Sequence, residues 1–189
     1  MTRARALAAL VTVLVAGTAE AASFTLDAGR LQEATKVGEG SVGQDEFGDE
    51  WRVRNRAGEQ VLVMTPFYRV ALAARQAAFR KAALKPREAE RAAKEHDDRL
   101  VLWVDLKGSR PDFARQYSPR LIAGARHVEA AFIQNERTPG RGEDGTYVAR
   151  CVYAFPLRAL TPTATLVLVV RDPDNRQVSS FTIDLGSMR

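Results

Sequence analysis

The chain has 189 residues, of which 46% are hydrophobic, and a formal net charge of +5. That length and composition predict one globular domain large enough to bury a core. The single cysteine, Cys151, excludes an internal disulfide, and so modest a charge indicates solubility and gives no sign of a nucleic-acid partner.

The start of the chain has the pattern of an export signal. Arg3 and Arg5 precede an uncharged, mostly apolar run, 6–16, which is followed by small residues ending in Ala21. A run of that length is too short to span a bilayer core, which needs about 20 residues. We therefore expect a Sec-type signal peptide, cleaved after Ala21, and a periplasmic or secreted mature chain, 22–189.

The next stretch is polar and rich in glycine. After a short expected strand at 23–27, residues 28–45 predict a flexible loop. The loop contains a G-x-G-x-x-G pattern at 38–43. A dinucleotide site needs a buried strand before this pattern and a helix start directly after it. A polar segment precedes it instead, so we expect no bound cofactor.

An acidic cluster follows the glycines, and it consists of Asp45, Glu46, Asp49 and Glu50. Four acids so close together raise the question of a calcium site. Their spacing lacks the alternating oxygen ligands and the final bidentate Glu of a calcium-binding loop. We therefore expect a solvated loop and no metal.

A β-hairpin and two helices are predicted next. Strands at 51–55 and 60–64 flank a turn that contains Asn and Gly, and the second strand is apolar on both faces, which suggests cover on both sides. Thr65 and Pro66 are typical of a helix start, and helices are expected at 66–84 and at about 86–98. The faces expected to pack together are Tyr68, Leu72, Phe79 and Ala83 of the first helix and Ala89, Ala92, Ala93 and His96 of the second.

Strand patterns return for the rest of the chain. Residues 100–107 predict a strand with Trp103 as a large anchor, 128–134 predict another, and 136–145 predict an exposed loop. Three C-terminal strands between Thr146 and Leu185 are expected to be antiparallel neighbours in the heart of one sheet. Their buried faces are expected to hold Tyr147, Ala149, Cys151, Tyr153 and Phe155, and Phe181, Ile183 and Leu185.

These elements predict the fold class. Runs of strands joined by turns, without alternating helices, are typical of antiparallel sandwiches and not of a parallel sheet. We expect a mainly β fold: an antiparallel β-sandwich, immunoglobulin-like or similar, with an inserted α-helical hairpin at about 66–98. The hairpin is flanked by strands with no linker, so 22–189 forms a single domain.

The sequence contains few residues of the types that usually carry out catalysis. The only histidines are His96 and His127, neither at a metal-ligand spacing, and no G-x-S-x-G motif occurs. Paired carboxylates hydrolyse glycosides without histidine, and a pair of Cys151 with His127 is conceivable across neighbouring strands. The carboxylate candidates are Asp105, Asp112, Glu129 and Glu143, and nothing in the sequence selects among them.

The first helix is the segment that most suggests a functional contact, because 66–85 holds five cations and no acid. The cations are Arg69, Arg75, Arg80, Lys81 and Lys85. One interpretation is contact with an anionic lipid surface, an acidic polymer or an acidic protein. The other is a solvated helix balanced by the acids of its partner helix. A helical wheel does not segregate the charges, which favours the second interpretation.

Together these observations favour binding over catalysis. The richness in Ala and Arg suggests a bacterial source. We expect an exported binding or structural component of the bacterial cell envelope, with an envelope protein or polymer as partner and without cofactor, metal or nucleic acid. Two alternatives stay open: peripheral binding to an anionic membrane or acidic polymer through the basic helix 66–85, and a hydrolase with an unrecognised site.

Overall fold

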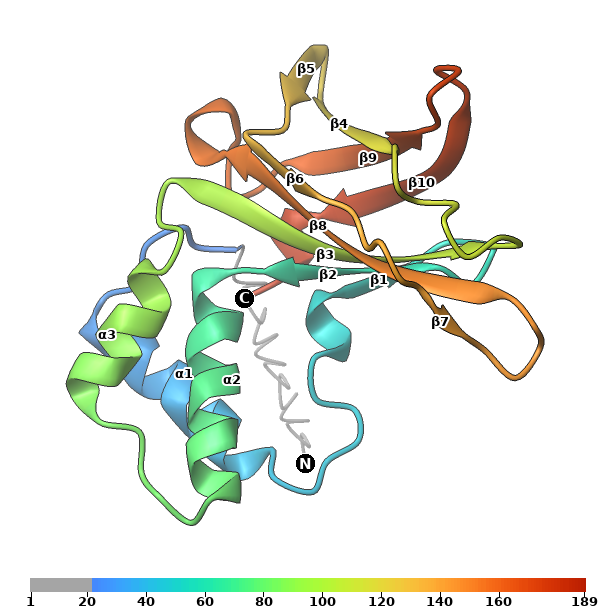
Figure 1. The fold of residues 1–189 in the computed structure, drawn as a ribbon. Helices are drawn as coiled ribbons and strands as arrows, with labels where there is room; N and C mark the ends of the chain where they lie inside the picture. Colours follow the sequence, from blue (N-terminus) through green and yellow to red (C-terminus); the bar gives the residue numbers. More distant parts are fainter. Residues whose placement is uncertain (1–21) are drawn as a thin grey trace, which may run out of the picture.

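Two antiparallel sheets and three helices make up residues 22–189, the part of the chain that this computed structural model describes. The expected signal peptide, 1–21, lies outside the described residues. The sheets face each other, and the helices lie on the side of sheet A that is turned away from sheet B (Figure 1). The predicted fold class, a mainly β antiparallel sandwich with inserted helices, is confirmed.

Sheet A has the strand order β1-β2-β3-β8-β6, with β7 also paired to β8, and sheet B has the order β10-β9-β4-β5. The strands of sheet A are β1 (Arg52–Arg54), β2 (Gln60–Met64), β3 (Arg99–Gly108), β6 (Phe132–Gln134), β7 (Gly140–Arg141) and β8 (Tyr147–Pro156). The strands of sheet B are β4 (Ser118–Ala123), β5 (Arg126–Glu129), β9 (Thr165–Arg171) and β10 (Gln177–Asp184).

Alternation along the strands builds the core between the sheets. Every second residue of β3 from Leu100 to Leu106 is buried there, and so are the alternate residues of β8 from Ala149 to Phe155. Sheet B supplies the opposite wall through residues such as Leu168. The predicted inward faces of β8 and β10 are therefore confirmed, except that Tyr147 is only half-buried.

The grouping of the last three strands was predicted wrongly. β8 pairs with β3 in sheet A, whereas β9 and β10 pair with each other in sheet B. After Pro156 the chain makes a short 3-10 turn, Leu157–Ala159, and crosses to the other sheet. β8 and β9 are consecutive along the chain but lie in opposite sheets. The two sheets face each other because each needs an apolar partner layer.

A helix, α1 (Ala28–Gly40), stands where the sequence predicts a flexible loop, so that prediction is wrong. Asp27 caps the helix by accepting a hydrogen bond from the backbone N of Arg30 at 2.8 Å. The expected strand at 23–27 is absent from the described structure. The G-x-G-x-x-G pattern starts inside the last turn of α1, where the carbonyl end of the helix dipole disfavours phosphate.

The two predicted helices form, but each ends earlier than expected. α2 (Pro66–Phe79) begins at its expected cap, where Thr65 Oγ1 accepts a hydrogen bond from the backbone N of Tyr68 at 3.1 Å. α3 (Pro86–Lys94) ends before His96, which has a left-handed φ of 56° and belongs to the following turn. His96 therefore does not lie on the packed face of a helix, contrary to prediction.

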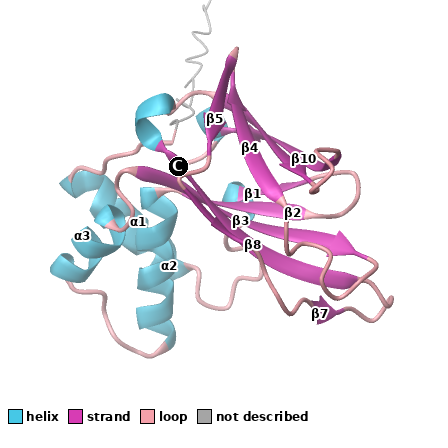
Figure 2. Cartoon of the chain, turned by 45° about the horizontal axis from the view of Figure 1, so that its top comes forward, coloured by secondary structure: helices cyan, strands magenta, loops and turns pink. Residues whose placement is uncertain are grey.

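The predicted helical pair, α2 and α3, is inserted between β2 and β3, and α1, which precedes the first strand, joins it in a layer of three helices. α1 crosses α2 so closely that a Cβ on Gly38 would overlap the carbonyl oxygen of Ala71 and lie 2.8 Å from the Cβ of Ala74. The layer stands at one end of the sandwich (Figure 2). The small residues of α2 therefore pack against α1, and Phe79, expected in the packed face, is exposed.

Arg189, the last residue of the sequence, ties this layer to sheet A. Its main-chain oxygen accepts hydrogen bonds from Trp51 Nε1 and Thr65 Oγ1, both at 2.7 Å. Its guanidinium pairs with Glu50 at 2.6 Å and lies 5.2 Å from the centre of the Phe67 ring. The start of α2 is therefore held in place by the end of the chain.

Gly38 offers a test of the helix crossing. Replacing Gly38 with Ala should lower the free energy of unfolding by about 1–3 kcal/mol, because the added methyl group forces α1 away from α2. The change is measured by urea unfolding followed by circular dichroism.

The matched control is Gly40→Ala in the same helix, where nothing lies within 4 Å of the added Cβ. It should leave stability unchanged or raise it by up to about 1 kcal/mol. Equal effects of the two substitutions would contradict the close crossing of α1 and α2.

Candidate functional site

Of the five cations expected to meet an anionic partner, Arg69 is the most buried, with 6% of its surface exposed. Its Nε donates to the carbonyl of Ala92 at 3.2 Å and its Nη2 to the carbonyl of Ala93 at 2.9 Å. These carbonyls end α3, where a cation is favourable. Burial lowers the pKa of Arg69, and the charges of Glu95 and Asp97 oppose that shift. The Arg69 guanidinium is thus used to join α2 to α3.

Arg75 is also engaged within the protein. Its Nη2 donates to the carbonyl of Gln44 at 2.9 Å, and its guanidinium carbon lies 4.6 Å from the centre of the Phe47 ring. Both contacts reach the loop between α1 and sheet A. Arg75 therefore holds that loop against α2.

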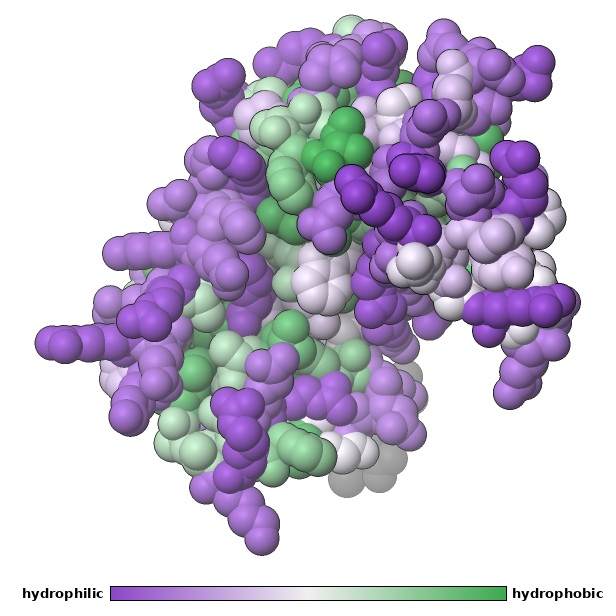
Figure 3. All heavy atoms as spheres, in the orientation of Figure 1, coloured by the Kyte–Doolittle hydropathy of each residue, from purple (hydrophilic) through white to green (hydrophobic). Residues whose placement is uncertain are grey.

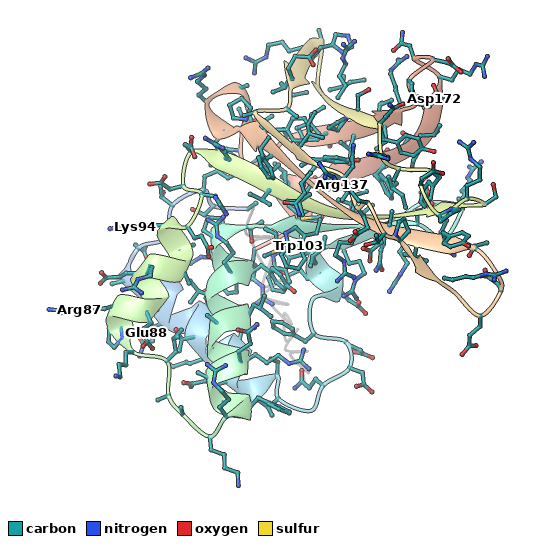
Figure 4. The ribbon with its side chains drawn as sticks, viewed as in Figure 1. Arg87, Glu88, Lys94, Trp103, Arg137 and Asp172 are labelled. Carbon is teal, nitrogen blue, oxygen red and sulfur yellow. The ribbon has the colours of Figure 1, made fainter. Side chains whose placement is uncertain are left out.

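The other three cations stand exposed at the end of α2. We call the segment 79–87, which joins α2 to α3 and opens α3, the basic connection. It carries Arg80, Lys81, Lys85 and Arg87 and no acid, and none of these four cations forms an ion pair with any described residue. Arg87 points outward from α3 (Figure 4).

Phe79 begins the basic connection with 80% of its surface in water, the largest exposure among the large hydrophobic residues of the described chain. Sequence reasoning missed it, because the helical wheel places Phe79 beside Tyr68 and Leu72 on an apparently packed face. At the end of α2 no described element covers this wheel position, and no local pattern in the sequence indicates that.

A second candidate site is a groove of about 310 Å³ in the angle between α2 and the outer face of sheet A. In Figure 1, α2 runs away from the sheet instead of lying along it, and Figure 3 shows pale and green surface at this junction, bordered by charged side chains. We call it the α2–sheet groove. It is lined by Met64, Arg69, Leu72, Ala73, Gln76, Ala92, Glu95, His96, Val101, Trp103 and Val152.

Trp103 belongs to the sheet side of this groove. The sequence predicts it as an anchor, but β3 turns it to the outer face of sheet A, where 37% of its surface is exposed. Its cross-strand neighbours are Leu62 on β2 and Val152 on β8. Trp103 lies beside α2 below the sheet (Figure 4). The indole therefore forms a broad, accessible apolar surface at the groove.

Polar side chains on the helix side of the groove have unused hydrogen-bonding capacity. The side chains of Gln76, Glu95 and His96 make no hydrogen bond to another described residue. The Nη1 of Arg69 is buried without a partner among the described atoms. A pocket with an apolar floor and a few convergent polar groups is typical of small-molecule sites.

The next row of side chains on the same face is ionic. Arg150 forms two hydrogen bonds to the Asp105 carboxylate, at 2.7 and 3.0 Å, and Gln60 donates a third at 2.7 Å. Burial alone would raise the pKa of Asp105, but these hydrogen bonds outweigh it and hold the pKa below its ordinary value. Asp105 is therefore a satisfied structural carboxylate.

The other expected catalytic candidates stand apart from Asp105. Asp112 lies in the loop before β4, Glu129 on β5 pairs with Arg120 at 3.2 Å, and Glu143 is exposed between β7 and β8. The four candidates thus occupy separate elements of the described structure. No carboxylate pair for glycoside hydrolysis emerges among the described residues.

The conceivable pair of Cys151 and His127 has no shared accessible site. Cys151 is fully buried between the sheets, and burial raises its pKa, which disfavours the reactive thiolate. His127 is exposed on β5. Cys151 therefore serves as a core residue.

Two of the four acids in the acidic cluster form ion pairs with arginines. Asp49 pairs with Arg52, and Glu50 pairs with Arg189. Within residues 22–189 no group of three or more His, Cys, Asp or Glu side chains is placed to hold a metal ion. In the same range, no helix is both long and apolar enough to cross a bilayer.

Comparisons with known proteins add little. No protein-family description and no curated protein matches the chain. Among solved structures, the chain is similar to the "IgNAR antibody domain C3", with 17% sequence identity and a TM-score of 0.32, over 53% of this chain and 86% of that one. So distant a likeness carries no statement about function.

Arg69 can be tested as a structural residue. Replacing it with Met should lower the free energy of unfolding by about 2 kcal/mol, because the last carbonyls of α3 lose a charged donor. Arg80→Met removes an exposed cation from the opposite end of α2 and should change stability by less than about 0.5 kcal/mol. Chemical denaturation of both variants measures the difference, and equal values would refute the structural role of Arg69.

The Asp105 ion pair predicts a pH dependence. A carboxyl whose pKa is lowered on folding stabilises the protein above its unfolded pKa, about 3.9, and loses that contribution as the pH falls through the folded value. Asp105→Asn should therefore cost about 1 kcal/mol at pH 7, a value reduced by the exposure of Arg150. The cost should shrink when unfolding is measured near pH 3. A cost that is the same at both pH values would contradict the lowered pKa.

Proposed function

We propose that the protein is an exported binding protein of the cell envelope that attaches to an anionic membrane surface through the basic connection, 79–87. The observation that carries this proposal is the exposed ring of Phe79 among four cations. The export pattern at the start of the sequence supports a location where such a surface is present.

Burial of Phe79 provides the apolar part of the attachment. A ring that is 80% exposed leaves apolar area in water, and moving it into the headgroup region recovers about 25 cal/mol for each Å² removed from water. Aromatic residues beside cations are typical of segments that lie at membrane interfaces. The exposed Ala82 and Ala83 continue the same segment without a charge.

The cations provide the electrostatic part. A basic residue near an anionic leaflet contributes about 1 kcal/mol, and the contribution falls off within a Debye length. The first acid after the segment is Glu88, whose carboxylate accepts a hydrogen bond from the backbone N of Lys85 at 3.1 Å and so places one negative charge beside the segment. One acid beside four cations leaves the segment with a net positive charge.

This proposal narrows the set of residues expected from the sequence. Arg69 and Arg75 are engaged inside the protein, so the contact consists of Arg80, Lys81 and Lys85, with Phe79 and Arg87 added. An acidic polymer would meet the same cations but offers no apolar layer for Phe79. A lipid surface therefore accounts for more of the exposed segment than a polymer does.

Vesicle binding tests the proposal. The protein should co-sediment with vesicles of phosphatidylcholine and phosphatidylglycerol, more weakly as salt rises, and hardly at all with phosphatidylcholine alone. A variant with Arg80, Lys81 and Lys85 all changed to Gln should bind about 100-fold more weakly, from three contributions of about 1 kcal/mol each. Phe79→Ala should weaken binding by about tenfold.

The matched control changes three exposed cations elsewhere on the chain, Arg110, Arg115 and Arg137, to Gln. It alters the net charge equally and should retain nearly all of the binding. If this control loses as much affinity as the variant of the basic connection, attachment depends on net charge and the proposed contact is wrong. The proposed contact is also wrong if the triple variant of the basic connection loses binding to an acidic polymer but binds vesicles as tightly as the wild type.

A further inference from the structure

The α2–sheet groove carries an inference that does not rest on membrane attachment. We propose that it is a binding site for a neutral saccharide, with Trp103 as the stacking surface. On α2 the groove is lined by Arg69, Leu72, Ala73 and Gln76, whereas the basic connection begins at Phe79, the last residue of the same helix. The two sites therefore have separate residues, apart from the helix that they share.

The sheet side of the groove suits one face of a sugar ring. The indole of Trp103 is accessible on the outer face of sheet A, between Leu62 and Val152 on the adjacent strands. The C–H groups on one face of a pyranose ring form an apolar surface of similar width to an indole. Stacking the sugar face on the indole removes both apolar surfaces from water. It also places the C–H groups, which carry a slight positive charge, against the electron-rich face of the indole.

The helix side suits the hydroxyl groups at the edge of the ring. Gln76 can both donate and accept, Glu95 accepts, and His96 offers a ring nitrogen. None of these side chains forms a hydrogen bond to another described residue. A purely apolar ligand would cover these polar groups without satisfying them, at a cost of about 1–3 kcal/mol for each.

The charges lining the groove select against ionic ligands. Arg69 contributes a buried cation and Glu95 an exposed carboxylate, and the charge of Glu95 acts on Arg69. An anionic ligand would face Glu95, and a cationic ligand would face Arg69. A neutral ring with several hydroxyls avoids both repulsions and still uses donors and acceptors.

The size of the groove limits the length of the ligand. Ligand pockets commonly enclose about 300–1,000 Å³, and about 310 Å³ lies at the lower end. The groove is open to solvent, so the rest of a longer chain can leave it. We therefore expect one sugar unit of a polysaccharide or oligosaccharide to occupy the site.

Soluble trisaccharides provide the test. Cellotriose, maltotriose and the trimer of N-acetylglucosamine are titrated into the protein that comprises residues 22–189. Binding is followed by calorimetry and by tryptophan fluorescence. The chain has two tryptophans and Trp51 is buried, so a fluorescence change on stacking reports Trp103. At least one trisaccharide should bind saturably.

Three variants distinguish the groove from other surfaces. Trp103→Ala should weaken the binding by at least about tenfold, and Gln76→Ala, an exposed position on α2, by about fivefold. Phe79→Ala removes an exposed aromatic outside the groove and should leave sugar affinity unchanged, while Trp103→Ala should leave vesicle binding unchanged. Thermal melting shows whether each variant is folded.

The proposal is overturned if none of the three sugars binds the wild-type protein, or if Trp103→Ala and Gln76→Ala, both folded, bind as tightly as the wild type. It is also overturned if Phe79→Ala weakens sugar binding as much as Trp103→Ala, because the contact is then a general one with exposed rings. Loss of vesicle binding in Phe79→Ala alone bears only on the membrane proposal.

Discussion

Sheet A is apolar on its inner face and on the end of its outer face that meets the helices, and the rest of the structure depends on how those two surfaces are covered. The inner face packs against sheet B around residues such as Leu102 and Tyr153. The outer face is covered by the helices only at one end, where Met64, Val101 and Ala154 are buried. Beyond that point Trp103 stays accessible, so incomplete cover of the outer face creates the groove.

The position of α2 follows from the two ends of that helix. Its start is fixed directly after β2 by Thr65, which caps the helix and also donates to the main-chain oxygen of Arg189. Its side is fixed by the crossing with α1 at Gly38 and by the hydrogen bonds from Arg69 to the end of α3. A helix held this firmly at its start presents the groove along Arg69 to Gln76 and exposes Phe79 at its end.

Local sequence patterns predicted β1, β2, β3, β8, β9 and β10, because each of these strands needs only alternation and turn residues. The hairpin of β1 and β2, the capped start of α2 and the buried alternation of β8 all follow this way. The patterns missed β4, and the strand expected at 128–134 is divided between β5 and β6. α1 was missed because its apolar positions are few and three of its thirteen residues are glycine. One of these glycines, Gly38, is needed for close packing, which a helix-propensity argument counts as unfavourable.

The sequence by itself determined the fold class, the expected export pattern and the absence of familiar catalytic motifs, because these depend on composition and on spacing along the chain. Tertiary structure alone decided which cations are free: Arg69 is buried against α3, whereas Lys81 is exposed. It also decided that Trp103 faces outward beside Gln76, a residue far away in the sequence. Such choices depend on which layer covers which face, and periodicity within one element carries no information about its neighbours.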